Sequence, residues 1–151
     1  MIAYIDTSTL IKLLINEAGT AQAGAIWDEP DVLVAARIVH VEARAALAAA
    51  RRQGRISEPV LRDAVGGLEV LWSQVSIVEI DEHLMCLAGD TAEKHGLRGY
   101  DAVHLAAARQ VGADVFSSAD RQLCEAAGAA GMHVADPTHD DGPPSAPDDR
   151  S

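Results

Sequence analysis

The sequence predicts an α/β fold in which helices cover both faces of a parallel sheet of four to five strands. Short apolar segments rich in β-branched residues alternate with longer helical patterns along the chain, as in βαβ proteins. The 151 residues fit one domain that buries its own core. Because 48% of the residues are hydrophobic but only 3% are aromatic, we expect a closely packed core of Ala, Val, Leu and Ile.

The first expected strand begins at Met1 and ends at Asp6, after an apolar stretch. Thr7 and Ser8 follow, and one of them is expected to cap the helix that begins there. In open parallel sheets, ligands bind beyond the carboxyl ends of the strands, so Asp6 lies where chemistry usually occurs. On this stretch alone, a simple helix cap is an equally good interpretation of Asp6.

The remaining elements continue the alternation of strands and helices. We expect strands at residues 31–35, 75–80, 114–118 and 132–135, and helices at residues 21–27, 37–53, 58–74, 82–95, 99–110 and 119–127. Ser57 and Asp81 are expected to be the N-caps of their helices. After Asp136 the chain is rich in Pro and Asp, so residues 137–151 are expected to form a disordered acidic tail.

The charge of the chain excludes one class of function. Its 12 Lys and Arg stand against 23 Asp and Glu, a net charge of −11. This excess opposes non-specific coating of a nucleic acid. It does not oppose a metal-dependent enzyme that acts on one, because carboxylates gathered around a cation account for part of the excess.

The cysteine pattern and the hydropathy indicate the compartment. Cys86 and Cys124 are widely spaced and lie in helical patterns, so we expect reduced, buried thiols rather than a disulfide framework. No apolar run reaches membrane-spanning length, and no basic leader precedes the first strand. We therefore expect a soluble, cytoplasmic protein.

Four acidic residues lie within otherwise apolar elements: Asp6, Glu42, Asp101 and Asp120. Asp6 and Asp120 follow strand ends, which meet at one edge of a parallel sheet. Asp101 lies in the first turn of a helix, where the helix dipole favours an anion, and Glu42 borders an apolar helix face. Few Lys or Arg lie in these segments, and burying unpaired carboxylates is very costly. The pattern therefore predicts a divalent cation, and oxygen ligands favour Mg²⁺ or Mn²⁺ over zinc.

The four acids occur in four motifs: Tyr-Ile-Asp-Thr-Ser, Val-Glu-Ala-Arg, Gly-Tyr-Asp-Ala-Val-His-Leu-Ala-Ala-Ala and Ser-Ser-Ala-Asp-Arg-Gln-Leu. Each motif is weak alone, but their order and spacing resemble the PIN-domain ribonucleases, and more narrowly the VapC toxins of bacterial toxin–antitoxin pairs. The resemblance covers residues 1–136 and implies a PIN-like nuclease domain, a three-layer α/β/α sandwich. The acidic tail is not part of the family pattern.

The resemblance also implies an activity, a site and partners. The activity is that of an endoribonuclease that hydrolyses phosphodiester bonds and leaves a 5′-phosphate and a 3′-hydroxyl. Its catalytic metal ligands for Mg²⁺ or Mn²⁺ fall on the four acids, with Ser8, Thr7 and Ser118 as supporting residues. The implied partners are an RNA substrate, a VapB-like antitoxin that masks the acidic cleft, and a second copy of the chain in a homodimer.

Several basic residues and one histidine have two interpretations each. Arg37 and His40, on the helix that carries Glu42, are candidates for RNA contacts, and solvated helix residues fit equally well. Arg51 and Arg52 are candidates for guiding RNA, but cations also suit a helix C-terminus, which is the interpretation we favour. For His104, three residues after Asp101, we favour a core-packed histidine over one that touches the site.

Two rival functions belong to other classes. A phosphohydrolase or receiver-type domain also places an aspartate after its first strand, but it requires an Asp-x-Asp pair and a later lysine that do not appear here. A catalytically weak or inactive PIN-like module that acts through its antitoxin or dimer surface is the other alternative. The presence of all four acids argues against it.

Overall fold

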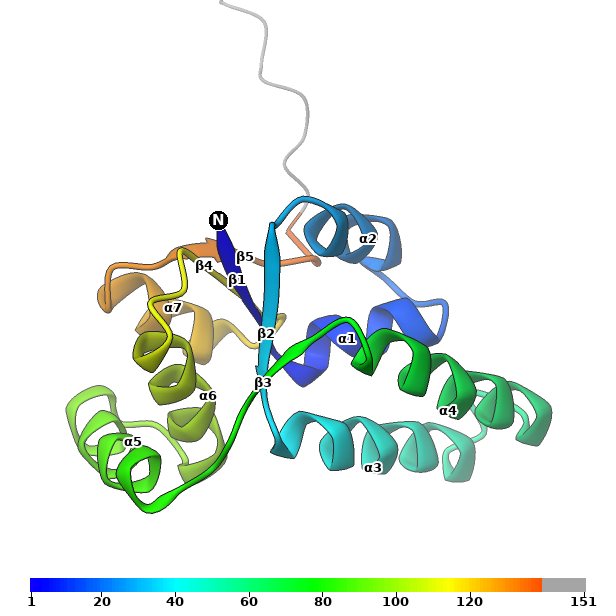
Figure 1. The fold of residues 1–151 in the computed structure, drawn as a ribbon. Coiled ribbons are helices and arrows are strands. Elements are labelled where there is room, and N and C mark those ends of the chain that lie inside the picture. Colours follow the sequence, from blue (N-terminus) through cyan, green and yellow to red (C-terminus); the bar gives the residue numbers. More distant parts are fainter. Residues whose placement is uncertain (140–151) are drawn as a thin grey trace, which may run out of the picture.

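Five parallel strands form the centre of the computed structural model, which describes residues 1–139. Along the sheet they follow the order β3-β2-β1-β4-β5, and every neighbouring pair is parallel (Figure 1). The strands are β1 (Ile2–Ile5), β2 (Val32–Ala36), β3 (Ser76–Val78), β4 (Val115–Ser117) and β5 (His133–Ala135). Their carboxyl ends therefore all lie at one edge, as predicted.

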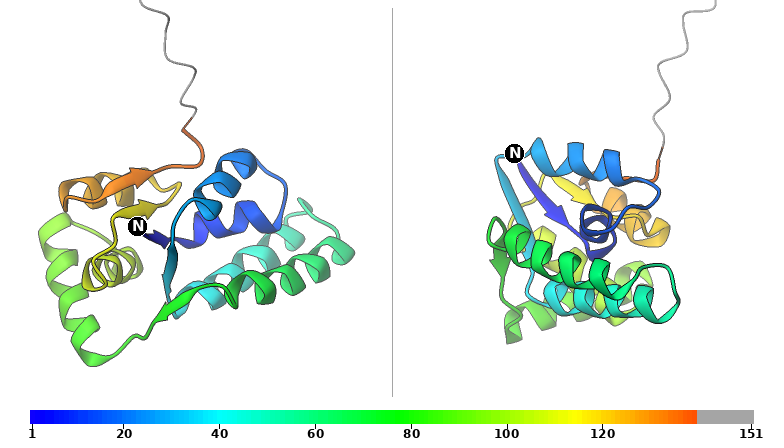
Figure 2. Two further views of the ribbon diagram at one scale, coloured as in Figure 1. Left: turned by 45° about the horizontal axis from the view of Figure 1, so that its top comes forward. Right: turned by 90° about the vertical axis from the view of Figure 1, so that its right-hand side faces the viewer.

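Helices cover both faces of this sheet. The helices in the described residues are α1 (Thr7–Leu14), α2 (Thr20–Asp28), α3 (Ile38–Arg52), α4 (Glu58–Trp72), α5 (Glu82–His95), α6 (Gly99–Gln110) and α7 (Arg121–Ala129). Helices α1 to α4 enclose one core cluster and α5 to α7 the other, on opposite sides of the sheet (Figures 1 and 2). The predicted three-layer α/β/α sandwich is confirmed.

The central strand β1 shows how the sequence divides the core in two. Tyr4 belongs to the cluster under α5 to α7, whereas Ala3 and Ile5 belong to the cluster under α1 to α4. This alternation follows from the two-residue period of a strand. Because helices cover both faces of the sheet, the sequence of β1 is continuously apolar and does not alternate with polar residues. Asp6, which follows β1, is thus attached to a strand that is packed on both of its faces.

Helix starts match the predicted caps in two cases and differ in one. Ser57 Oγ accepts a hydrogen bond from the Val60 N–H (3.4 Å), and Asp81 Oδ1 accepts one from the Leu84 N–H (2.8 Å). The prediction that Thr7 or Ser8 caps α1 is wrong, because α1 already begins at Thr7. Asp6 occupies the cap position in extended backbone, but its side chain makes no capping hydrogen bond.

Other expectations have mixed outcomes. Both cysteines are free, but only Cys124 is partly buried; Cys86 is exposed, because α5 packs through its other face, on which Leu84 and Ala88 are buried. No helix within residues 1–139 is long and apolar enough to cross a membrane. Of the expected tail, residues 140–151 lie outside the described residues.

Candidate active site

Asp6 follows the last residue of β1 and is fixed by its neighbours. Its backbone N–H continues the sheet pairing by donating to Ser117 O of β4 (2.9 Å). One carboxylate oxygen, Oδ2, accepts hydrogen bonds from Ser8 Oγ (3.0 Å) and from Ser118 Oγ (2.8 Å). The residue is 7% exposed. Ser8 and Ser118, the residues predicted to support the site, thus supply two hydroxyl groups that bond one oxygen of Asp6.

Glu42 projects from α3 toward the same region and is partly buried. Its Oε1 accepts a hydrogen bond from Thr7 Oγ1 (3.1 Å) and lies 2.8 Å from His104 Nε2. Burial alone raises the pKa of the Glu42 carboxyl, but the contacts with His104 and Thr7 outweigh it, and the pKa lies below its usual value. Glu42 is therefore ionised at neutral pH.

His104, on α6, touches both acids. It is 2% exposed, and its Nε2 lies 2.8 Å from Glu42 Oε1 and 3.6 Å from Asp6 Oδ1, although the N–H is aligned with neither for a full hydrogen bond. Burial lowers the pKa of the imidazole, yet the hydrogen-bonding contact with Glu42 and the nearby negative charges raise it above its ordinary value. The histidine is buried as we favoured, but it also contacts the site, which we did not favour.

Asp101 and Asp120 lie at the starts of two other helices. Asp101, in the first turn of α6, lies 3.4 Å from Arg98 Nε and contributes to raising the pKa of His104. Asp120 caps α7, since its Oδ1 accepts from the Leu123 N–H (3.0 Å). Its own N–H donates to Ser118 Oγ (3.0 Å), the hydroxyl that also bonds Asp6. One network therefore joins Asp120 to Asp6.

The donor set suits a hard divalent cation. Its atoms are carboxylate oxygens, and within the described residues Arg98 is the one Lys or Arg that forms an ion pair with any of the four acids. Asp6 is thus nearly buried with no Lys or Arg partner, a costly state that a bound cation relieves. As the side chains stand in residues 1–139, however, no three His, Cys, Asp or Glu are grouped closely enough to hold a metal ion.

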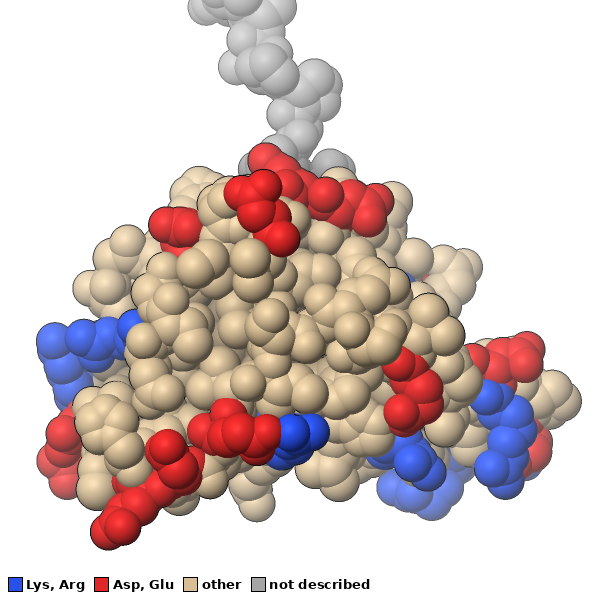
Figure 3. Space-filling view, in the orientation of Figure 1, with Lys and Arg blue, Asp and Glu red and all other residues tan. Residues whose placement is uncertain are grey.

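The candidate RNA contacts lie elsewhere or are already paired. Arg37 forms an ion pair with Glu79, and His40 Nε2 lies 2.7 Å from Glu69 Oε1. Arg51 and Arg52 are in the last turn of α3, about 14 Å along the helix axis from Glu42. Basic and acidic side chains are mixed at this end of α3 and the start of α4 (Figure 3). The structure does not bring Arg51 and Arg52 together with the four acids.

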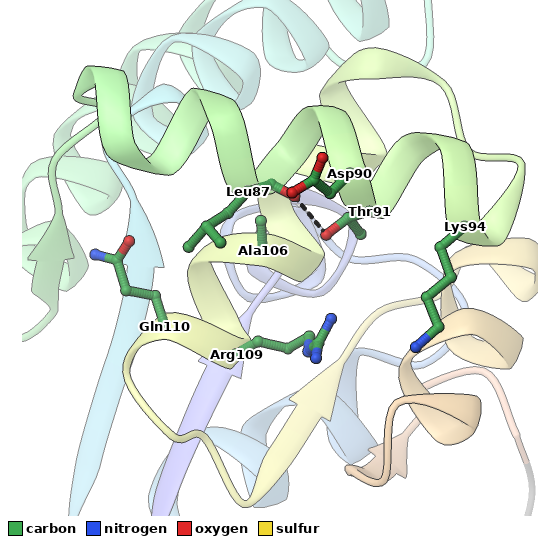
Figure 4. A pocket seen from close by; sticks show the side chains of 7 residues that line it. All are labelled: Leu87, Asp90, Thr91, Lys94, Ala106, Arg109 and Gln110. Carbon is green, nitrogen blue, oxygen red and sulfur yellow. Dashed lines mark hydrogen bonds between the residues drawn. The ribbon is translucent and has the colours of Figure 1, made fainter.

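A cavity of about 410 Å³ between α5 and α6 is separate from this site (Figure 4). It is lined by Leu87, Asp90, Thr91, Lys94, Ala106, Arg109 and Gln110. None of the four acids lines it, and Arg109 is in the last turn of α6, at the opposite end from Asp101. The cavity is therefore not part of the carboxylate site.

Comparisons with known proteins place the chain in a family. Residues 3–129 match the PIN domain family. Two Mycobacterium tuberculosis proteins, Ribonuclease VapC45 and Ribonuclease VapC49, are each 42% identical to the chain over 136 residues, which are 89% of this chain and 94% of each relative.

Solved structures share the fold at low sequence identity. Mycobacterium tuberculosis VapC20, described as a sarcin–ricin loop cleaving toxin, aligns with a TM-score of 0.64 and 21% identity over 87% of this chain and 96% of that one. A toxin–antitoxin complex from Klebsiella pneumoniae contains a chain that aligns with a TM-score of 0.58 and 18% identity, over 80% and 87% of the two chains. These likenesses extend the fold assignment to proteins of distant sequence.

Proposed function

This chain belongs to the PIN-domain family, among the VapC-type ribonucleases, and we propose that it is a Mg²⁺- or Mn²⁺-dependent endoribonuclease that acts as the toxin of a toxin–antitoxin pair. The observation that carries the metal-dependent part is Asp6, a carboxylate 7% exposed at the carboxyl end of the central strand with no Lys or Arg partner in the described residues. Glu42 adds a second carboxylate, which faces the same nitrogen of His104, Nε2.

The proposed division of labour follows the surroundings of each acid. Asp6, Glu42 and Asp101 would hold the cation directly or through water, and Asp120 would complete a second metal site or orient the attacking water. When bound, the cation would lower the pKa of a bound water and neutralise charge on the phosphate. Thr7, Ser8 and Ser118 would keep Glu42 and Asp6 in place through their hydroxyl groups.

A cleavage assay tests this proposal directly. Purified protein is incubated with structured RNA in Mn²⁺ or Mg²⁺, with and without EDTA. We expect cleavage that EDTA abolishes, 5′-phosphate ends, and a loss of at least about 100-fold in Asp101→Asn, since losing even an outer-shell partner of a metal costs 10- to 100-fold. The matched control is Asp90→Asn, an aspartate from the cavity of Figure 4, which should cut like the parent. If Asp101→Asn also cuts like the parent, the metal-site assignment is wrong.

An antitoxin partner is the second part of the proposal. Its support is the relatives named VapC and the similar chain within a toxin–antitoxin complex. An anionic site favours a partner that inserts a basic side chain between the carboxylates. We expect co-expression with the product of a short neighbouring reading frame to yield a complex without nuclease activity. Arg→Ala substitution in the partner's C-terminal part should restore cleavage.

We also propose that the chain forms a homodimer. The support is an apolar groove of about 490 Å³ with exposed Met85 and Tyr100 along it, since exposed apolar patches commonly mark protein interfaces. Sedimentation analysis of Met85→Lys should show a monomer. Val70→Lys, at an exposed valine on α4 that does not line this groove, is the control and should leave the dimer intact. A dimer in both variants would show that the interface lies elsewhere.

A further inference from the structure

The buried His104 has a polar side chain close to each of its ring nitrogens. Nδ1 lies 2.7 Å from Tyr4 Oη, and Nε2 faces Glu42 Oε1 at 2.8 Å and Asp6 Oδ1 at 3.6 Å. A histidine kept only to fill the core needs no such arrangement. The ring instead connects the central strand to two acids that come from different elements, one after β1 and one on α3.

Tyr4 determines which nitrogen of His104 carries a proton. Its hydroxyl accepts a hydrogen bond from the Ala36 N–H of β2 (3.1 Å), and its ring is completely buried and stacked on Phe116, with 5.2 Å between the ring centroids. Because burial raises the pKa of the phenol well above its usual value, the hydroxyl keeps its proton. Within the described residues, Nδ1 is the one acceptor near this buried hydroxyl, so the hydroxyl donates its hydrogen to Nδ1 of a neutral ring, which leaves the ring proton on Nε2. In the charged imidazolium Nε2 is protonated as well, so an N–H faces the acids in both states.

The donors around the two carboxylates gather on one oxygen of each. Glu42 Oε1 receives Thr7 Oγ1 and faces His104 Nε2, whereas no hydrogen bond within residues 1–139 engages Glu42 Oε2. Asp6 Oδ2 receives both serine hydroxyls, and Asp6 Oδ1 has only the longer contact with His104. One oxygen of each acid thus remains available for a cation.

We propose that His104 is a positioning residue, which with Tyr4 keeps Nε2 against Glu42 Oε1 and, at longer range, Asp6 Oδ1, and so fixes the orientation of both carboxylates at the cation site. This inference rests on the proposed metal-dependent function. Partners of this kind, which orient ligands without binding the metal themselves, typically change metal affinity by 10- to 100-fold. His104 acts through the two carboxylates and is not itself a ligand.

Two isosteric substitutions separate positioning from packing. In His104→Gln the side-chain amide reaches the place of Nε2 and keeps a donor toward the acids. In His104→Asn the amide reaches only the place of Nδ1, so it keeps the contact with Tyr4 and loses that donor. Mn²⁺ affinity is measured by calorimetry on the full chain, and the metal dependence of RNA cleavage is measured beside it.

We expect His104→Asn to bind Mn²⁺ about 10- to 100-fold more weakly, and to need correspondingly more metal for half-maximal cleavage, with kcat at saturating metal largely restored. His104→Gln should remain close to the parent. Equal affinity in both variants, or an equal loss in both, would overturn the positioning role. If a His104 variant fails to fold, Tyr4→Phe decides, because it keeps the ring stack and removes only the hydroxyl: weaker Mn²⁺ binding supports the proposal, and unchanged binding overturns it.

A metal-free measurement keeps this inference distinct from the proposed function. Nitrogen NMR of the imidazole in EDTA should show His104 protonated at Nε2, and Tyr4→Phe should release this preference. A parent that shows this tautomer but neither binds Mn²⁺ nor cuts RNA refutes the metal-dependent function and not the Tyr4–His104 arrangement. A proton on Nδ1 of the neutral ring refutes the arrangement, whatever the activity.

Discussion

Helices α1, α5 and α7 each begin after an aspartate, and the three carboxylates are used in different ways. All three aspartates have extended backbone at the cap position. Asp81 and Asp120 accept a hydrogen bond from a backbone N–H of the helix they precede, whereas the Asp6 carboxylate accepts from the hydroxyl groups of Ser8 and Ser118 instead. The backbone N–H groups in the first turn of α1 donate to the backbone carbonyl of Asp6.

This difference lowers the stability that the cap position contributes to α1. A side-chain cap contributes about 0.5–2 kcal/mol to stability, and α1 forgoes it. The carboxylate is instead kept nearly buried without a Lys or Arg partner, which is unfavourable unless a cation binds. Asp81 serves stability, Asp6 serves the proposed site, and Asp120 does both.

The largest expected effect is a contrast between substitutions at Asp6 and Asp81, because the first should change RNA cleavage and the second should change stability. Asp6→Asn should reduce RNA cleavage by at least about 100-fold, since a ligand matters more than the outer-shell partners that cost 10- to 100-fold, while metal-free stability stays equal or rises because a buried charge is removed. Asp81→Ala should cut normally and lose about 1 kcal/mol of unfolding free energy. Urea unfolding in EDTA measures the stability of the two variants, and RNA cleavage rates measure their activity. If Asp6→Asn unfolds more easily and still cuts, the comparison fails.

Asp120 allows its two roles to be separated on one residue. Serine retains a capping oxygen but no carboxylate, and alanine removes both. Asp120→Ala should lose about 1 kcal/mol of stability and Asp120→Ser much less, because serine is also a good N-cap. Both should cut RNA about 10-fold more slowly if the carboxylate completes the site. Normal cleavage by Asp120→Ser would make Asp120 a helix cap alone.

The sequence predicted most of the fold because its signals are local. The apolar strand before Asp6, the Ser57 and Asp81 caps and the helix that starts at Gly99 each depend on residues within a few positions of one another. The three-layer arrangement follows from their alternation. The expectation that the four acids share one edge came from the parallel sheet and the family resemblance.

What the sequence did not predict depends on contacts between distant segments. The Asp6 side chain was available for capping by every local rule, but it bonds Ser8 and also Ser118, which is 112 positions away. The contact of His104 with Tyr4 spans 100 positions. The three-residue spacing between Asp101 and His104 was a signal that His104 contacts the site. A histidine among alanines and leucines, however, is equally typical of a core. Contacts of this kind can be identified only when the fold is known.

Ser118 should give a smaller effect than either aspartate. Its hydroxyl donates to Asp6 and accepts from the Asp120 N–H, so it joins the two helix starts. We expect Ser118→Ala to weaken Mn²⁺ binding about 10-fold and to cost about 1 kcal/mol of stability, because the part-buried N–H of Asp120 loses its partner. Ser73→Ala, which removes an exposed serine hydroxyl bonded to Val70 O, is the matched control and should change neither quantity appreciably. If Ser118→Ala and Ser73→Ala have the same Mn²⁺ affinity and stability, Ser118 has no role in the site.

The smallest expected effect uses Cys124 as a probe of the charge at the start of α7. Burial, and then the charges of Asp136, Asp120 and Asp6, raise the pKa of this thiol to about 11. At pH 8 only about 1 in 1,000 molecules therefore carries the reactive thiolate, and the rate of alkylation by iodoacetamide should rise tenfold per pH unit up to that pKa.

Mg²⁺ bound by the acids should cancel part of this negative field, lower the pKa of Cys124 and speed its alkylation by about two- to fivefold. Exposed Cys86, in the same molecule, should react at an unchanged rate and serves as the internal control. Asp120→Ser should speed the reaction in the absence of metal for the same electrostatic reason. A Cys124 rate that responds to Asp120→Ser but not to saturating Mg²⁺ would place the cation beyond the reach of α7, and would assign Asp120 to capping rather than to the site.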